Sequence, residues 1–172
     1  MLFHSYQFAV FFAVVFALYV VLRHRWQNRM LLVASYVFYG SWDWRFLSLI
    51  VLSTVTDYLC SLGIESTDVK RIRKRYVGVS LFVNLSLLGV FKYYDFFAGS
   101  FQTFVGRSGI DIDPVLINVI LPIGISFYTF QTISYTVDVY RGKVPAARNI
   151  FDFALYVSYF PQLVAGPIER GM

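Results

Sequence analysis

Long apolar runs separated by short basic segments dominate this chain. A helix needs about 20 mostly apolar residues to cross the roughly 30 Å hydrocarbon core of a bilayer. Five runs approach or reach that size, and they cover residues 6–22, 30–42, 46–64, 76–91 and 115–137. The pattern predicts an all-α, polytopic transmembrane helical bundle in which residues 1–172 belong to one domain.

Proline and glycine interrupt the last part of this pattern. Pro122 lies inside the run 115–137, where a missing backbone donor predicts a kink. Residues 153–168 carry Pro161, Gly166 and Pro167 and cannot form one regular helix. We therefore expect kinked and broken helices, which survive at membrane depth only against protein or a wet cavity.

Composition supports the membrane interpretation. The 172 residues are 58% hydrophobic and only 15% charged, whereas soluble proteins contain about 25% charged residues. So small a body cannot bury that much apolar surface, so the chain is expected to contact membrane lipid. The single cysteine, Cys60, excludes a disulfide framework and a cysteine-rich metal site.

The net charge of +5 comes from basic residues between the apolar runs, not from a continuous patch that would bind nucleic acid. If all the runs cross, eleven Lys and Arg in segments 23–29, 70–75 and 141–148 lie on one side. The opposite segments hold Arg45, Lys92 and Arg107. The positive-inside rule then places the basic side in the cytoplasm and the N-terminus outside.

Polar side chains recur on one face of two predicted helices. Ser53, Asp57 and Ser61 follow each other at intervals of four residues. The second stripe, on the run 115–137 and the residue after it, consists of Tyr128, Gln131, Thr132, Tyr135 and Asp138. Each stripe is expected to point inward, either to bond helices together or to line a polar cavity, because a polar group facing lipid is costly.

The segment 160–170 breaks helix geometry and exposes carbonyl groups that lipid cannot satisfy. We expect a re-entrant or cavity-lining loop, and a loop that emerges into water is the alternative. Its candidate residues are Pro161, Gln162, Gly166, Pro167, Glu169 and Arg170. Glu169 and Arg170 could pair with each other or hold an anionic ligand.

The residues alone contain no convincing catalytic set and no metal site. Gly124-Ile125-Ser126-Phe127-Tyr128 lacks the second glycine of a nucleophile elbow, and no phosphate-binding glycine loop is present. His4 and His24 are expected in water, and Cys60 is expected to be a small buried side chain.

Three segments together resemble the membrane-bound O-acyltransferase family, in its alginate O-acetyltransferase branch. They are NLSLLGVFKYYDFF at 84–97, LPIGISFYTFQ at 121–131 continuing to DVYRG at 138–142, and FPQLVAGPIER at 160–170. The resemblance implies a multi-pass enzyme of the bacterial inner membrane that moves an acetyl group outward. Its implied donor is acetyl-CoA, with no bound cofactor, and its implied recipient is an exported polysaccharide reached through periplasmic acetylation proteins.

The family's catalytic histidine follows the 160–170 motif by well over a hundred residues, and neither His4 nor His24 matches it. We therefore expect an N-terminal fragment without transferase activity of its own, in which the candidate residues shape a cavity. Two other classes stay open: a small transporter or channel component, which predicts two symmetric halves, and a nonenzymatic membrane scaffold.

Overall fold

The computed structural model describes residues 5–106 and 124–165, and these residues form helices without any strand. The elements are α1 (Tyr6–Val21), α2 (His24–Asp43), a 3₁₀ turn η1 (Trp44–Phe46), α3 (Leu47–Glu65), α4 (Lys70–Leu88), a π-helical turn η2 (Gly89–Tyr93), α5 (Tyr94–Gly106), α6 (Ile125–Tyr140), α7 (Ile150–Ser158) and α8 (Phe160–Ala165). The all-α prediction is confirmed for this part of the chain.

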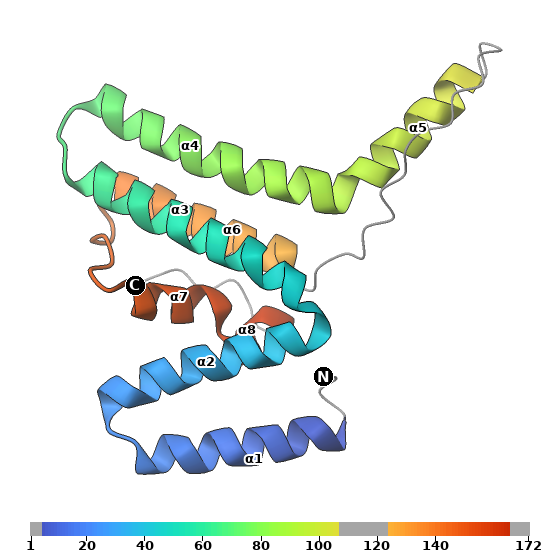
Figure 1. The fold of residues 1–172 in the computed structure, drawn as a ribbon. Helices are drawn as coiled ribbons and strands as arrows, with labels where there is room; N and C mark the ends of the chain where they lie inside the picture. The colour runs from blue at the N-terminus through green and yellow to red at the C-terminus, as the bar shows by residue number, and fades with distance from the viewer. Residues whose placement is uncertain (1–4, 107–123, 166–172) are drawn as a thin grey trace.

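The helices form a bundle centred on α3, in which α4 runs antiparallel and α6 runs parallel to α3 (Figure 1). Helix α3 packs against α4, α6 and α7, while α4 also packs against α6. Helix α2 packs against α7 and α8, and α1 lies at the edge of the bundle beside α2. Helix α5 continues from α4 through η2 and projects away from the other helices (Figure 1).

Two helices begin earlier than the apolar pattern predicts. Helix α2 begins at His24 and α4 begins at Lys70, so most of segment 23–29 and all of segment 70–75 are helical, not loops. Hydropathy locates the stretch that suits lipid, but backbone hydrogen bonding continues into the basic turns beyond it. The connections α1–α2, α3–α4 and α6–α7 nevertheless lie at the same end of the bundle, here called the basic end (Figure 1).

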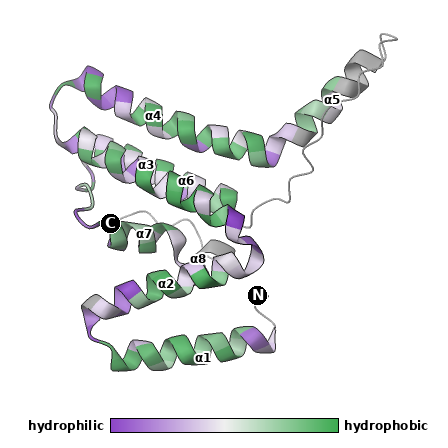
Figure 2. Cartoon of the chain, in the orientation of Figure 1, coloured by the Kyte–Doolittle hydropathy of each residue, from purple (hydrophilic) through white to green (hydrophobic). Residues whose placement is uncertain are grey.

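The described helices carry an apolar surface. Two helical stretches, Trp26–Glu65 and Lys70–Tyr93, are long and apolar enough to cross a membrane. Figure 2 shows hydrophobic residues along α1 and hydrophilic residues at the starts of α2 and α4. Phe82 on α4 is 73% exposed. An exposed apolar surface of this kind is expected of a protein surrounded by lipid.

The expected breaks are found in part. The helix is interrupted at Tyr159, where α7 has ended and α8 has not yet begun. Residues 153–165 therefore do not form one helix, as predicted. The expectation of one helix over 115–137 is wrong at Gly124, whose φ of 76° is left-handed, and α6 starts only after it. Pro122 lies outside the described residues. The π-helical turn η2 was not expected.

Candidate functional site: polar groups between the helices

The polar stripe of α3 faces α4 and α6, with Asp57 at its centre. The Asp57 carboxylate accepts hydrogen bonds from Ser80 Oγ, from Asn84 Nδ2 at 2.8 Å and from Thr136 Oγ1 at 3.3 Å. Asp57 and Asn84 are 0% exposed, and the two hydroxyl groups are also buried. The donors from α4 and α6 thus satisfy this carboxylate, and no cationic side chain of the described residues pairs with it.

Asn84 extends the network toward the next turn of α3. Its Oδ1 accepts from Ser53 Oγ at 2.6 Å and from Thr132 Oγ1 at 3.4 Å, while its Nδ2 also donates to the Ser80 carbonyl at 2.9 Å. Both ends of the amide are therefore occupied. We call Ser53, Asp57, Ser80, Asn84, Thr132 and Thr136 the closed network. Its internal bonds join three helices in the way that interhelical hydrogen bonds do in membranes.

Sequence analysis did not identify Ser80 or the amide of Asn84 as members of this site. They lie four residues apart on α4, which is the same spacing that marked the stripe on α3. The spacing therefore indicated a buried face of α4. Because serine and asparagine are uncharged, however, they did not distinguish α4 from a lipid-facing helix. Ser61 lies apart from the closed network and donates to the Tyr58 carbonyl at 2.8 Å.

The four candidate residues of α6 lie on its buried side. Tyr128 and Gln131 are 0% exposed, Tyr135 is buried, and Asp138 lies near the basic end, where Lys143 Nζ is 3.7 Å from Asp138 Oδ1. Tyr135 Oη accepts from the Ala147 N–H at 2.7 Å. All four side chains therefore lie on the inward face of α6, as predicted. Asp138 lies nearer the surface than the other three and forms an ion pair with Lys143.

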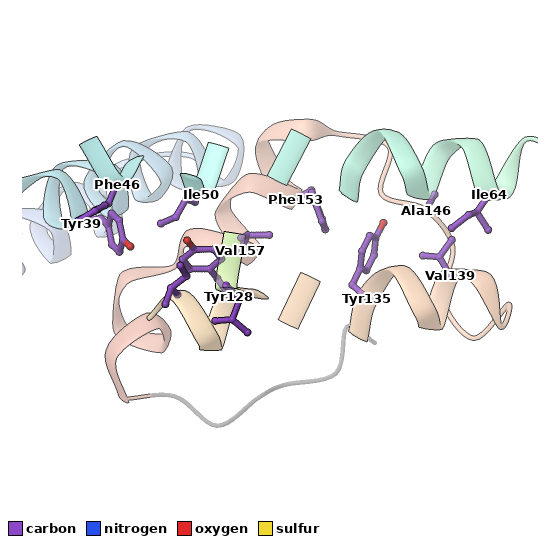
Figure 3. Close-up of a cluster of buried hydrophobic side chains, with 12 residues drawn as sticks. Tyr39, Phe46, Ile50, Ile64, Tyr128, Tyr135, Val139, Ala146, Phe153 and Val157 are labelled. Atoms are coloured by element: carbon purple, nitrogen blue, oxygen red, sulfur yellow. The ribbon is translucent and has the colours of Figure 1, made fainter. Parts of the chain in front are cut away.

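Three of the candidate residues carry buried polar atoms that have no hydrogen-bond partner among the described residues. They are Tyr128 Oη, Gln131 Oε1 and Gln162 Nε2. Gln131 uses only its Nε2, which donates to the Tyr156 carbonyl at 3.0 Å. Figure 3 shows the ring of Tyr128 within the apolar cluster, beside Ile50 and Val157.

An unsatisfied buried donor or acceptor costs about 1–3 kcal/mol, so native proteins rarely keep several without a reason. We call Tyr128, Gln131 and Gln162 the unpaired set. Water, a ligand or another part of the chain would relieve this cost. These atoms are therefore the best candidates for contacts with a substrate.

Only part of the 160–170 segment can be placed. Pro161 occupies the first turn of α8, where no backbone donor is required of it, and Gln162 follows it. Gly166, Pro167, Glu169 and Arg170 lie outside the described residues, so their predicted cavity-lining role stays a prediction. Within residues 5–106 and 124–165, no cluster of three His, Cys, Asp or Glu side chains could hold a metal ion.

Comparison with known proteins identifies relatives of this chain. The probable alginate O-acetylase AlgI of Pseudomonas aeruginosa is 44% identical over 173 residues, which is 99% of this chain and 33% of the relative. The corresponding protein of Azotobacter vinelandii is 42% identical over 99% of the chain. The peptidoglycan O-acetyltransferase of Helicobacter pylori is 35% identical over 80% of the chain.

No family model and no solved structure matches the chain significantly. The chain spans about a third of the length of the curated relatives named above. Identities of 42–44% over 99% of its residues show that the chain is homologous to about one third of the length of the probable alginate O-acetylases.

Proposed function

We propose that this chain is part of a bacterial inner-membrane O-acetyltransferase, which carries acetyl groups from cytoplasmic acetyl-CoA to an exported, alginate-like polysaccharide. The observation that carries the proposal is the identity of 42–44% with probable alginate O-acetylases over 99% of the chain. Periplasmic acetylation proteins would receive the acetyl group on the outer side. The chain by itself is proposed to lack activity.

The two polar regions would have different tasks in such an enzyme. The closed network would fix α3, α4 and α6 relative to one another, because its donors and acceptors already satisfy each other. The unpaired set would line the acyl path, where Tyr128 Oη and Gln162 Nε2 can donate and Gln131 Oε1 can accept. These residues would position the substrate, and no described residue is assigned as nucleophile or general base.

The orientation follows from the basic end. Segments 23–29, 70–75 and 141–148 hold eleven Lys and Arg, and all three segments lie at the basic end of the bundle (Figure 1). We infer that this end lies in the cytoplasm and that the N-terminus is periplasmic. Labelling of the Ser5→Cys and Ser66→Cys variants with an impermeant maleimide tests this orientation. Only the Ser5→Cys variant should react from the periplasm.

A chimera tests the function directly. The chain would replace its matching segment in the P. aeruginosa alginate O-acetylase, in a strain lacking that protein, and the acetyl content of secreted alginate would be measured. We expect acetylation to be restored. A chimera that reaches the membrane in normal amount but yields unacetylated alginate would overturn the proposal.

The same chimera tests the unpaired set. Gln162→Ala is expected to lower acetylation about tenfold or more, because misplacing a substrate by a small distance has effects of that size. Gln7→Ala is the matched control, since Gln7 lies exposed on α1. Equal acetylation by the two variants would refute the role given to Gln162.

A further inference from the structure

An apolar groove runs between α1 and α2 on the outside of the bundle. It encloses about 420 Å³, and its walls include Phe11, Leu18, Leu22, Val33 and Val37. Val33 and Val37 are 62% and 52% exposed, so the groove is open to its surroundings. The lining fits an aliphatic chain and offers no hydrogen bond along most of its length.

The length of the groove matches one leaflet of a membrane. From Phe11 to Leu22 the chain advances eleven residues, which is about 16 Å at the helical rise of 1.5 Å per residue. Half of the hydrocarbon core is about 15 Å. The groove therefore extends from the middle of the bundle to the basic end, as a lipid tail in the cytoplasmic leaflet would.

A polar pocket of about 370 Å³ lies at the basic end, between the first turns of α2 and α7. Its lining includes His24, Asn28, Arg29, Asn149 and Asp152. No side chain caps the first turn of α2, and the N-terminal end of a helix favours an anion. The pocket thus combines the guanidinium group of Arg29, near the N-terminal end of α2, with the carboxylate of Asp152.

Arg29 lines both the polar pocket and the apolar groove. Its guanidinium lies 5.2 Å from the centre of the Trp26 ring and 5.8 Å from that of Phe151, and it forms no ion pair among the described residues. Among the described residues, Asp152 accepts one side-chain hydrogen bond, from Asn28 Nδ2 to Oδ1 at 3.0 Å, and none of them bonds to Oδ2. The two opposite charges of the pocket are therefore both available to a ligand.

We propose that the groove and the pocket together form a binding site for a phospholipid with an ethanolamine headgroup. One acyl tail lies in the groove between α1 and α2. Arg29 and the first turn of α2 hold the phosphate, and Asp152 accepts a hydrogen bond from the ammonium group. This site rests on the membrane location included in the proposed function, and it adds a specific lipid to it.

The charge pattern distinguishes this headgroup from its competitors. A phosphatidylglycerol headgroup would satisfy Arg29 but would bring no cation to Asp152. Free ethanolamine phosphate would satisfy both charges but would leave the groove empty. A phosphatidylcholine headgroup carries a positive charge but has no N–H group to donate to the carboxylate.

Native mass spectrometry of the purified chain tests the site. The chain would be exchanged from detergent into vesicles of equal phosphatidylethanolamine and phosphatidylglycerol, re-extracted, and its retained lipids identified. We expect one retained phosphatidylethanolamine per chain, enriched several-fold over phosphatidylglycerol. Equal retention of both lipids, or retention of phosphatidylglycerol alone, would overturn the proposal, as would equal binding of ethanolamine phosphate without tails.

Three variants separate the parts of the site. Arg29→Gln is expected to lower retention about tenfold, since a charge-assisted bond is lost. Asp152→Asn is expected to remove the preference for ethanolamine while keeping lipid binding, and Val33→Trp is expected to fill the groove and lower retention of both lipids. The matched controls are Lys74→Gln and Val79→Trp, which lie exposed on α4.

Controls that lose lipid as strongly as the site variants would refute the proposal, because binding would then follow general charge and hydrophobicity. Helix content measured by circular dichroism identifies any variant that fails to fold, and the exposed Asp152→Asn change preserves shape. Acetyl transfer does not enter this readout. A chain without retained lipid refutes this site alone, whereas a membrane-inserted chimera without acetylation refutes the proposed function alone.

Discussion

The closed network and the unpaired set arise from the same sequence pattern, but they differ in how completely their polar atoms are satisfied. In the closed network, Asp57 and Asn84 have partners at both ends of their carboxylate and amide groups. In the unpaired set, Tyr128 and Gln131 are equally buried, yet each has one polar atom without a partner in the described part of the chain. We therefore expect mutations in the closed network to reduce stability and mutations in the unpaired set to reduce function.

The strongest test of the closed network is Asp57→Ala. The change leaves the donors of Ser80, Asn84 and Thr136 without their acceptor in a buried site, so we expect a loss of about 3 kcal/mol in the free energy of unfolding. Denaturant unfolding in detergent, followed by circular dichroism, would measure it. Asp68→Ala, at an exposed position, is the control. Similar losses in both variants would contradict the structural role of the network.

Close packing of α3 on α4 accompanies the network and gives the next largest effect. A Cβ atom added to Gly63 would lie 2.5 Å from Cζ of Tyr76, so Gly63→Ala must displace a ring and is expected to cost about 1–3 kcal/mol. On the same pair of helices, Gly78 has nothing within 4 Å of an added Cβ. Gly78→Ala should therefore be neutral or slightly stabilising, and a stable Gly63→Ala protein would show that the two helices are not held this closely.

Tyr135→Phe tests a paired hydroxyl on α6. Its Oη accepts from the Ala147 N–H at 2.7 Å and donates to Ser61 Oγ at 3.4 Å, and phenylalanine would leave the amide unpaired. We expect a loss of about 1–2 kcal/mol. Unfolding curves of this variant and of Tyr19→Phe, at an exposed position on α1, provide the measurement and its control. An unchanged midpoint would mean that the Ala147 amide finds another acceptor.

Sequence reasoning predicted some of these features because they depend on local periodicity. The apolar run 46–64 nearly coincides with α3, and the spacing of Ser53, Asp57 and Ser61 correctly placed them on a buried face. Helix α2 begins before its apolar run, because a basic first turn can form a helix outside the lipid. Periodicity describes one helix at a time, so it could not show that Asn84 of α4 would meet Asp57.

The same reason explains why sequence could not separate the two polar regions. Asp57 and Gln131 look alike in a helical pattern, since both predict an inward side chain. Whether an inward polar atom is satisfied depends on which neighbouring helix brings a donor or acceptor to it. That information comes only from the arrangement of the helices, and it changes the expected consequence of mutation from lost stability to lost function.

The smallest expected change in stability, and the sharpest contrast with Tyr135, comes from Tyr128→Phe. The substitution removes only a hydroxyl that has no partner among the described residues and preserves the ring that packs beside Ile50 and Val157 (Figure 3). The free energy of unfolding should therefore stay the same or rise by up to about 1 kcal/mol, because an unsatisfied buried group is removed. Acetyl content in the chimera should nevertheless fall severalfold, since a substrate contact is lost. A Tyr128→Phe protein that loses stability as Tyr135→Phe does, and acetylates normally, would show that this hydroxyl belongs with the closed network and that incomplete pairing does not mark the acyl path.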